Sequence, residues 1–114
     1  MLLIYKILLP AEWADFETTG CFRGSPFDGS SGFIHCSSRE QVGATALRVF
    51  AQEPALVVVA LDTQMLGESV RWETASDGDV FPHIYADVPL SAVAATYLVS
   101  GASSVDAAVP IPGS

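Results

Sequence analysis

The sequence predicts one α+β domain whose sheet is split and either mixed or mostly antiparallel. Two amphipathic segments alternate with the first strand-like segments, and a run of further short strands follows, in the order β-α-β-α-β-β-β-β. Strands that succeed one another through short turns pair in the antiparallel sense and argue against a doubly wound parallel sheet. The chain has 114 residues, half of them apolar, which suits one domain with its own core.

The first two elements are a strand and a helix. Residues 2–9 are rich in apolar and β-forming side chains and predict the strand. Pro10 suits the first position of a helix, in which Trp13 and Phe16 lie on one face. Gly20 is placed to end this helix, because glycine readily adopts the left-handed conformation of a C-cap.

Residues 20–32 hold four glycines, three serines and a proline, and they predict a loop. A loop of this length is either a binding loop or lid, or a mobile surface segment, and the sequence leaves both open. A short strand over 33–38 follows, and a second helix begins at Ser37, which has capping-box spacing to Glu40. The predicted core-facing positions of this helix are Val42, Ala46, Val49 and Phe50.

The second half of the chain predicts short strands separated by turns. Residues 56–61 are continuously apolar, so this strand is expected at the centre of the sheet with both faces covered. Trp72 is expected in the core. The domain is expected to span residues 1–100, and residues 101–114 form a tail that is either frayed or extended over the surface. The other segments are a turn or single helical turn at 62–67, strands at 69–74, 81–86 and 94–100, and an Asp-Gly turn at 75–79.

Charge and cysteine content argue against several classes of protein. Thirteen acidic residues face five scattered basic ones, a net charge of −8, and such a surface repels the phosphate backbone of nucleic acids. The two cysteines make no disulfide framework, the first ten residues lack the pattern of a signal peptide, and no apolar run is long enough to span a bilayer. We therefore expect a cytoplasmic protein with two free thiols, no membrane contact and no nucleic-acid partner.

The most informative segment is GFIHCSS, residues 32–38. Strand alternation places His35 and Ser37 on one face and Cys36 on the other, so the imidazole and the thiol are not expected to act together. Ser37 and Ser38 then open a helix, whose free N–H groups and positive dipole end suit an anionic or carbonyl-bearing ligand beside the imidazole. The alternative is a half-buried His35 bonded to the backbone, with serines that only cap the helix.

A second polar face lies in the strand at 81–86. His83 and Tyr85 share this face and would form a polar floor with an aromatic wall, where a histidine transfers protons near neutral pH. Arg71 and Glu73 share a face of the strand at 69–74, either as a solvated ion pair or as the anchor and base of a site. We expect the two histidines of the chain to face one cleft.

Other chemistries have weaker signals. The sequence holds no Walker loop and no GxGxxG, HExxH, CxxC or GxSxG motif. His35, His83 and Glu73 would make a facial metal triad, but no pair among them has the spacing typical of metal ligands, so no metal is expected. Cys21 and Cys36 are weaker still as nucleophiles, because only the helix start beside Cys36 would activate a thiol.

Several segments together resemble a known family. They are IYKIL near the start, a Trp three residues after Pro10, GFIHCSS, the helix with Gln41, LVVVALD, RWE and FPHIYADVPLSAV. This pattern resembles the domain-of-unknown-function family 952, a family of small bacterial proteins, over about residues 3–97, and GFIHCSS and FPHIY with the following PL are its most specific parts. The resemblance carries no established activity.

The resemblance also implies a remote relationship to the ADP-ribosyltransferase fold, which includes the RNA 2′-phosphotransferases. Members of that fold bind NAD-like dinucleotides in a cleft of a split, mostly antiparallel sheet. His35-Cys36-Ser37 is similar to their His-Gly-Ser/Thr motif, in which the His holds a ribose hydroxyl and the Gly backbone meets the nicotinamide amide. Cys36 stands here in place of that Gly, and Glu73 would stand where a catalytic acid is expected.

The expected function is a nucleotide- or NAD-like ligand-binding enzyme or enzyme-like domain. The resemblance implies ADP-ribosyl- or glycosyl-type transfer as one candidate reaction and NAD or ADP-ribose as candidate cofactors, and the sequence leaves both the reaction and the cofactor open. His35, with Ser37 and Ser38, would orient a ribose or a phosphate at the start of the helix.

The remaining candidates have roles in the same cleft. His83 and Tyr85 would contact the leaving group or the nucleophile, and Glu73 or His83 would act as the base. Arg71 or Arg23 would neutralise phosphate. Two alternatives stay open: a non-catalytic interaction module that meets a basic protein partner, and hydrolysis or isomerisation of a small metabolite with His83 as general base.

Overall fold

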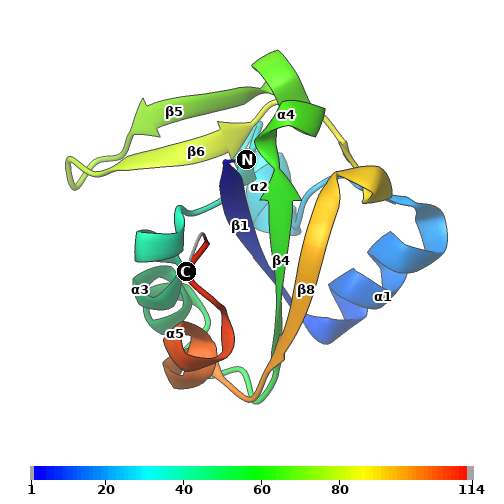
Figure 1. The fold of residues 1–114 in the computed structure, drawn as a ribbon. Helices are drawn as coiled ribbons and strands as arrows, with labels where there is room; N and C mark the ends of the chain where they lie inside the picture. Colours follow the sequence, from blue (N-terminus) through cyan, green and yellow to red (C-terminus); the bar gives the residue numbers. More distant parts are fainter. Residues whose placement is uncertain (1, 113–114) are drawn as a thin grey trace.

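A three-stranded sheet with the order β1-β4-β8 runs through the middle of the molecule in the computed structural model, which describes residues 2–112 (Figure 1). Its strands are β1 (Leu3–Leu8), β4 (Leu56–Asp62) and β8 (Val93–Val99). The apolar residues of β4 are all buried, and they alternate between two core clusters on the two faces of the sheet. The prediction of a central strand with both faces covered is therefore confirmed.

Helices cover both faces of this sheet (Figure 1). On one face, α1 (Pro10–Thr19) contributes the buried Phe16 to the first cluster. On the other, α3 (Arg39–Val49) contributes Val42 and Ala46, and α5 (Val105–Ala108) contributes Val105, to the second. Burial of one apolar face by each helix is what stabilises short helices of this kind.

Two smaller sheets complete the β structure. One has the order β3-β6-β5 and the other consists of β2 and β7, and every strand pair formed by residues 2–112 is antiparallel. The predicted α+β class and antiparallel pairing are confirmed, although the order of elements differs in detail from the expected one. The bounds are β2 (Cys21–Phe22), β3 (Ile34–His35), β5 (Val70–Thr74), β6 (Val80–Ile84) and β7 (Val88–Pro89).

An isolated β-bridge between Tyr5 and Ser37 joins the first sheet to the β3-β6-β5 sheet. The N–H of Tyr5 donates to the carbonyl of Ser37 and the N–H of Ser37 donates to the carbonyl of Tyr5, each at 2.8 Å. On the N-terminal side of this bridge the β3 chain leaves β1 and pairs with β6, where the N–H of Cys36 donates to the carbonyl of Pro82 at 3.1 Å. The two sheets therefore fork at the Tyr5–Ser37 bridge, and this fork positions the candidate site.

The prediction of a loop at 20–32 is wrong for most of its length, because the segment contains β2 and the helix α2 (Pro26–Ser31). Ser25 caps this helix: its Oγ accepts from the N–H of Asp28 at 3.2 Å, and Asp28 Oδ2 accepts from the N–H of Ser25 at 2.9 Å. Gly32 ends the helix with a φ of 84°. The short helix outweighs the loop composition because both of its ends are capped locally.

Three details of the predicted helix and strands need correction. Ser38 and Gln41 form the capping box of α3, since Ser37 is used in the bridge to Tyr5. Val49 is 56% exposed, because it faces the pocket described below and not the core. Trp72 is 44% exposed, because β5 is an edge strand with one neighbour.

Residues 101–112 of the predicted tail are folded and are neither frayed nor extended, and residues 113–114 lie outside the described part of the chain. This segment forms η3 (Ala102–Ser104) and α5, and Val105 and Val109 are buried against α3. The guanidinium of Arg39 holds it by donating to the carbonyls of Asp106, Val109 and Pro110. The remaining short elements are α4 (Thr63–Leu66), η1 (Gly67–Ser69) and η2 (Leu90–Ala92). None of the helices formed by residues 2–112 has the length and apolar character that a bilayer crossing requires.

Candidate functional site

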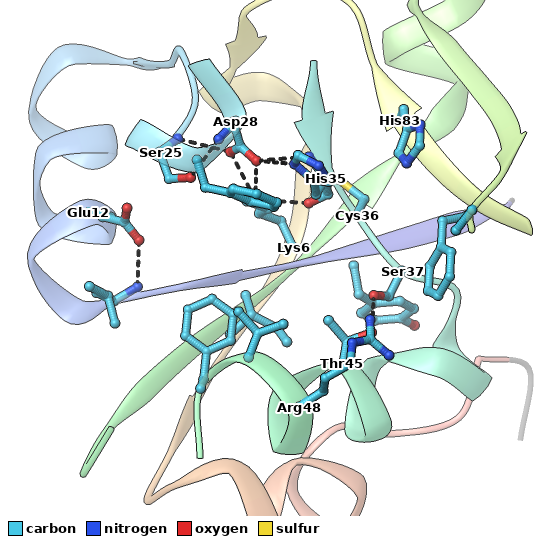
Figure 2. A pocket seen from close by; sticks show the side chains of 18 of the residues that line it. Lys6, Glu12, Ser25, Asp28, His35, Cys36, Ser37, Thr45, Arg48 and His83 are labelled. Carbon is cyan, nitrogen blue, oxygen red and sulfur yellow. Dashed lines mark hydrogen bonds and ion pairs between the residues drawn. The ribbon is translucent and has the colours of Figure 1, made fainter. Parts of the chain in front are cut away.

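A pocket of about 700 Å³ opens at the fork between β1, α2, β3, β6 and α3. Figure 2 shows Lys6, Asp28 and His35 on one side of it and Thr45 and Arg48, carried by α3, on the other. Apolar groups contributed by β1, α2 and the end of α3 line the rest of the wall. A volume of this size and a mostly apolar lining with a few polar groups are typical of sites for small organic ligands.

His35 and His83 lie directly opposite each other on the antiparallel strands β3 and β6. They form a non-hydrogen-bonded pair, because the bonds between these strands run through Cys36 and Pro82. Side chains approach most closely at such pairs, and the two imidazole centroids are 5.6 Å apart. Both rings line the pocket.

A buried carboxylate, that of Asp28, holds His35. Its Oδ1 lies 2.6 Å from Nδ1 of His35 and accepts from the His35 N–H at 3.1 Å. Burial by itself raises the pKa of Asp28, but the Lys6 ammonium and the N–H donors of Ser25 and His35 outweigh it and lower the pKa below the ordinary value. The ionised carboxylate can only accept, so Nδ1 of His35 carries a proton and Nε2 is the nitrogen left for a ligand.

Lys6 completes this cluster from the middle of β1. Its side chain is almost fully buried, and Nζ lies 3.0 Å and 3.3 Å from the two carboxylate oxygens of Asp28. Nζ also donates to the carbonyl of His35 at 2.9 Å. Lys6 therefore compensates the buried negative charge and ties β1 to β3 beyond the bridge.

His83 has a carboxylate partner of its own. Oε1 of Glu73, on the neighbouring strand β5, lies 2.7 Å from Nδ1 of His83 and accepts from the hydroxyl of Tyr85 at 2.6 Å. These two hydrogen bonds, that of Tyr85 first, lower the pKa of Glu73, so the Glu73 carboxylate also accepts from Nδ1. Each of the two imidazoles that line the pocket thus has its own carboxylate at Nδ1, which leaves Nε2 for a ligand.

Aromatic rings hold the imidazoles in place. Phe33 stacks on His83 with a centroid distance of 4.0 Å and lies 4.6 Å from the ring of His35. Phe27 stacks on the ring of His35 at 4.5 Å although it is 65% exposed. Such stacking restricts ring rotation, so the Nε2 atoms have defined directions.

The structure brings some of the sequence-predicted residues together and separates others. His35, His83 and Ser37 line the pocket, and Glu73 and Tyr85 lie beside His83. Ser37 is buried and its Oγ donates to Oγ1 of Thr45 at 3.0 Å. Whether these residues act as a site stays a prediction.

Ser38, Arg71 and Arg23 do not line the pocket. Ser38 caps α3, and the Arg71 guanidinium lies over the ring of Tyr85 at 5.1 Å. Arg23 lines a smaller hollow of about 310 Å³ beside α1 and pairs with Asp87 at 3.7 Å on the surface.

Cys36 belongs to the core cluster of the first sheet, and burial raises the pKa of its thiol to about 12. Its N–H is already bonded to Pro82, so it is not free to meet a nicotinamide amide in the way the sequence resemblance implied. Cys36 is also part of the pocket lining, and the expectation that it does not act together with His35 stays a prediction. Among residues 2–112, no three His, Cys, Asp or Glu side chains are placed to hold one metal ion.

Sequence reasoning missed several polar residues of the pocket, among them Lys6, Asp28, Thr45 and Arg48. For Lys6 and Asp28 the sequence holds a local feature that could have indicated their role. Lys6 is a lone cation inside an otherwise apolar strand, and such a residue is buried only when it is paired. Asp28 follows Ser25 and Pro26 at capping-box spacing, which indicates a helix start. Thr45 and Arg48 carry no comparable signal.

Comparison with known proteins shows the family of the chain. Residues 7–96 match the model of the family described as protein of unknown function (DUF952). The crystal structure of protein CC0527 from Caulobacter crescentus is 40% identical over 85% of each chain, with a TM-score of 0.81. The solution structure of the same protein is 42% identical over 84% of this chain and 83% of its own, with a TM-score of 0.75. No curated protein matches. The chain therefore belongs to the DUF952 family of proteins of unknown function.

Proposed function

We propose that this protein is an enzyme that transfers protons to and from a small ligand bound at the fork, with His35 and His83 as the acid–base pair. The observation that carries the proposal is the direct opposition of the two histidines, each with its own carboxylate on Nδ1. A neutral imidazole of this kind accepts a proton at Nε2, and a protonated one donates it there. Two such groups at one pocket suit a reaction in which one site takes a proton while the other returns one.

The carboxylates have the role of orienting groups in this proposal. Asp28 and Glu73 fix the tautomer and the direction of the rings and stabilise the protonated form of each histidine. Tyr85 and Lys6 hold the two carboxylates in turn. We regard Asp28, Glu73, Lys6 and Tyr85 as positioning residues, since the ligand would meet the imidazoles.

The ligand class that we propose is a nucleotide or a similar molecule with a flat ring and an anionic group. Phe27 offers an exposed aromatic face next to His35, on which a ring would stack. Arg48 lies at the pocket wall, and in the part of the chain that the structure describes no acidic side chain is within ion-pair distance of it. Arg48 would thus take the phosphate-binding role expected of Arg23 or Arg71.

ADP-ribosyl or glycosyl transfer is one reaction of this kind. We include NAD and ADP-ribose among the ligands to be tested because the sequence resemblance to the ADP-ribosyltransferase fold points to them. The split antiparallel sheet is compatible with that resemblance. The proposal of acid–base chemistry does not depend on that relationship, because hydrolysis or isomerisation of a small metabolite would use the same pair of histidines.

The test is a ligand screen followed by kinetics. Thermal shift of the wild-type protein against NAD, ADP-ribose, nucleoside phosphates and other small metabolites identifies ligands, and product formation is then followed by NMR. We expect a bell-shaped pH–rate profile and a loss of about a hundredfold or more in His35→Gln and in His83→Gln. Glu68→Gln, an exposed change outside the pocket, is the matched control. Unchanged turnover in both histidine variants would sink the proposal.

A second candidate is a non-catalytic module that binds a basic protein. The net charge of −8 supports it, as does the side chain of Leu98, which is 78% exposed on the edge strand β8. Pull-down with the wild type and with Leu98→Lys distinguishes the two: a stoichiometric basic partner that is lost in Leu98→Lys and kept in His35→Gln favours the module.

A further inference from the structure

Ile7 presents its backbone to the fork. Because both backbone bonds of Tyr5 go to Ser37, the odd-numbered residues of β1 direct their N–H and C=O away from β4. The register of β1 with β4 continues without a bulge to Ile7 and beyond. The N–H and C=O of Ile7 therefore point away from β4, at the edge of the β1-β4-β8 sheet that faces the pocket. Ile7 is part of the pocket lining.

The neighbouring positions along this edge are occupied. Ser37 takes both groups of Tyr5, and the N–H of Leu9 donates to the Glu12 carboxylate at 2.8 Å, while its carbonyl accepts from the N–H of Trp13 at 3.1 Å. Within residues 2–112 no hydrogen bond joins Ile7 to an element beyond the sheet. Backbone groups in protein interiors nearly always have hydrogen-bond partners. The N–H and C=O of Ile7 are therefore suited to bind a ligand in the pocket.

The fork explains why the backbone N–H and C=O of one residue at the edge of β1 have no strand to pair with. Continued pairing of the two strands past the Tyr5–Ser37 bridge would set Ile7 opposite His35. The β3 chain turns to β6 instead, and the N–H and C=O of His35 are satisfied by the Asp28 carboxylate at 3.1 Å and the Lys6 ammonium at 2.9 Å. The buried Lys6–Asp28 pair thus satisfies the backbone of His35, on the β3 side of the fork. It makes no hydrogen bond to the backbone of Ile7, on the β1 side.

We propose that this pocket recognises its ligand through a planar amide edge, a primary carboxamide or a ring lactam, paired with the backbone of Ile7. The carbonyl oxygen of the ligand would accept from the Ile7 N–H, and its own N–H would donate to the Ile7 carbonyl. The amide would occupy the place that the His35 backbone would take in a continuous sheet, on the side where His35 and His83 line the pocket. The inference rests on the proposed function, because it names the recognition group of the ligand on which the two histidines act.

The occupant is a small molecule and not a peptide strand. A peptide that adds a strand to a sheet edge needs several unpaired residues in alternation, and here Ile7 alone is open between the occupied Tyr5 and Leu9. The pocket lining also includes apolar side chains, among them Val49 and Phe50, which suit a ring attached to the amide.

The experiment uses three ring compounds of the same shape. Benzamide has both groups of the amide edge, benzoate lacks the N–H donor, and N,N-dimethylbenzamide lacks it and adds bulk. Titration of the isotope-labelled protein, followed by amide NMR, is expected to show that benzamide shifts the Ile7 amide resonance and slows its hydrogen exchange. Benzoate and N,N-dimethylbenzamide are expected to bind at least about tenfold more weakly, because each leaves the Ile7 carbonyl unbonded.

Two variants separate the backbone from the side chain. Ile7→Ala removes most of the side chain and keeps the N–H, whereas Ile7→Pro also removes the N–H, on an edge where no strand needs it. We expect Ile7→Ala to bind benzamide and Ile7→Pro to lose the preference for benzamide over N,N-dimethylbenzamide. If Ile7→Pro does not fold, the three compounds on the wild-type protein decide.

The outcomes distinguish this inference from the proposed function. Equal binding of the three compounds, shifts of the His35 and His83 rings without a shift of the Ile7 amide, or no binding of benzamide at millimolar concentration would overturn amide recognition and leave the acid–base pair untouched. Benzamide binding at Ile7, together with a catalytic reaction that does not depend on either histidine, would leave the amide site standing and remove the proposed function.

Discussion

Asp28 accepts a hydrogen bond from Nζ of Lys6 at 3.0 Å, across 22 positions of sequence, and both side chains are almost fully buried. A buried charge without a partner is strongly unfavourable, so each of the two residues requires the other. The pair also satisfies the backbone of His35, which links the stability of the fork to the geometry of the candidate site.

Asp28→Asn is expected to destabilise the protein by about 3–5 kcal/mol, because it leaves the Lys6 ammonium buried without a counter-charge. Urea unfolding followed by circular dichroism measures this change. Since the two groups interact directly, the double variant Lys6→Met/Asp28→Asn should lose less than the sum of the two single variants. A loss below about 1 kcal/mol in Asp28→Asn would show that the pair is not buried as described.

Stability should fall in acid through Asp28. The pKa of Asp28 is lower in the folded protein than the value of about 3.9 for an unfolded chain, so its contribution is present in full above that value. The contribution is lost as the pH falls through the folded pKa, because the unfolded state then takes up the proton first. Urea unfolding between pH 7 and pH 3 should show a shallower decline for Asp28→Asn than for the wild type. Identical slopes in the two proteins would contradict the assignment.

The two thiols should differ in reactivity. Cys36 is buried and its pKa is raised to about 12, whereas Cys21 is half-buried beside the smaller hollow. Because the thiolate is the reactive form, a disulfide reagent at pH 8 should modify Cys21 in the native protein and reach Cys36 only after unfolding. Mass spectrometry of the wild type and of Cys21→Ser counts the modified thiols. Modification of native Cys21→Ser at the rate of an unfolded control would refute the burial of Cys36.

Arg39 should matter more to stability than its ion-pair partner does. Its buried guanidinium donates to the carbonyls of Asp106, Val109 and Pro110, while the Asp106 carboxylate is largely exposed. Arg39→Met is expected to destabilise the protein by about 2–4 kcal/mol, since the buried carbonyl of Val109 and the part-buried carbonyls of Asp106 and Pro110 lose their donor. Asp106→Ala removes only a surface ion pair, with an expected effect of about 0–1 kcal/mol. Thermal unfolding of both variants measures which of them is less stable. A larger loss of stability in Asp106→Ala than in Arg39→Met would contradict the docking of residues 105–110 through Arg39.

Local patterns in the sequence were enough for the main elements of the fold. The continuous apolar run at 56–61, Pro10 at a helix start and Gly20 at a helix end each have one strong local cause, and each prediction is confirmed. The segment 20–32 has two competing signals, glycine content and the capping box of Ser25 with Asp28. The capping box outweighed the glycines there, since Gly32 itself serves as the C-cap.

Local patterns likewise predicted only part of the candidate site. Strand alternation grouped His83 with Tyr85, and both side chains meet the Glu73 carboxylate, because side-chain direction in a strand is a local property. Nothing local indicates that Arg48 lines the pocket or that Arg23 lies outside it. Which surface of a domain a charged side chain reaches depends on how helices pack on the sheet.

The sequence by itself determined the α+β class, the central buried strand and the faces on which the two histidines lie, since all of these follow from residue propensity and periodicity. Only the tertiary structure decided that His35 and His83 are register partners, because pairing between strands 48 residues apart depends on where β3 leaves β1. The same fork leaves the backbone of Ile7 open and places Asp28 and Lys6 beside His35, and no pattern within one segment contains that information.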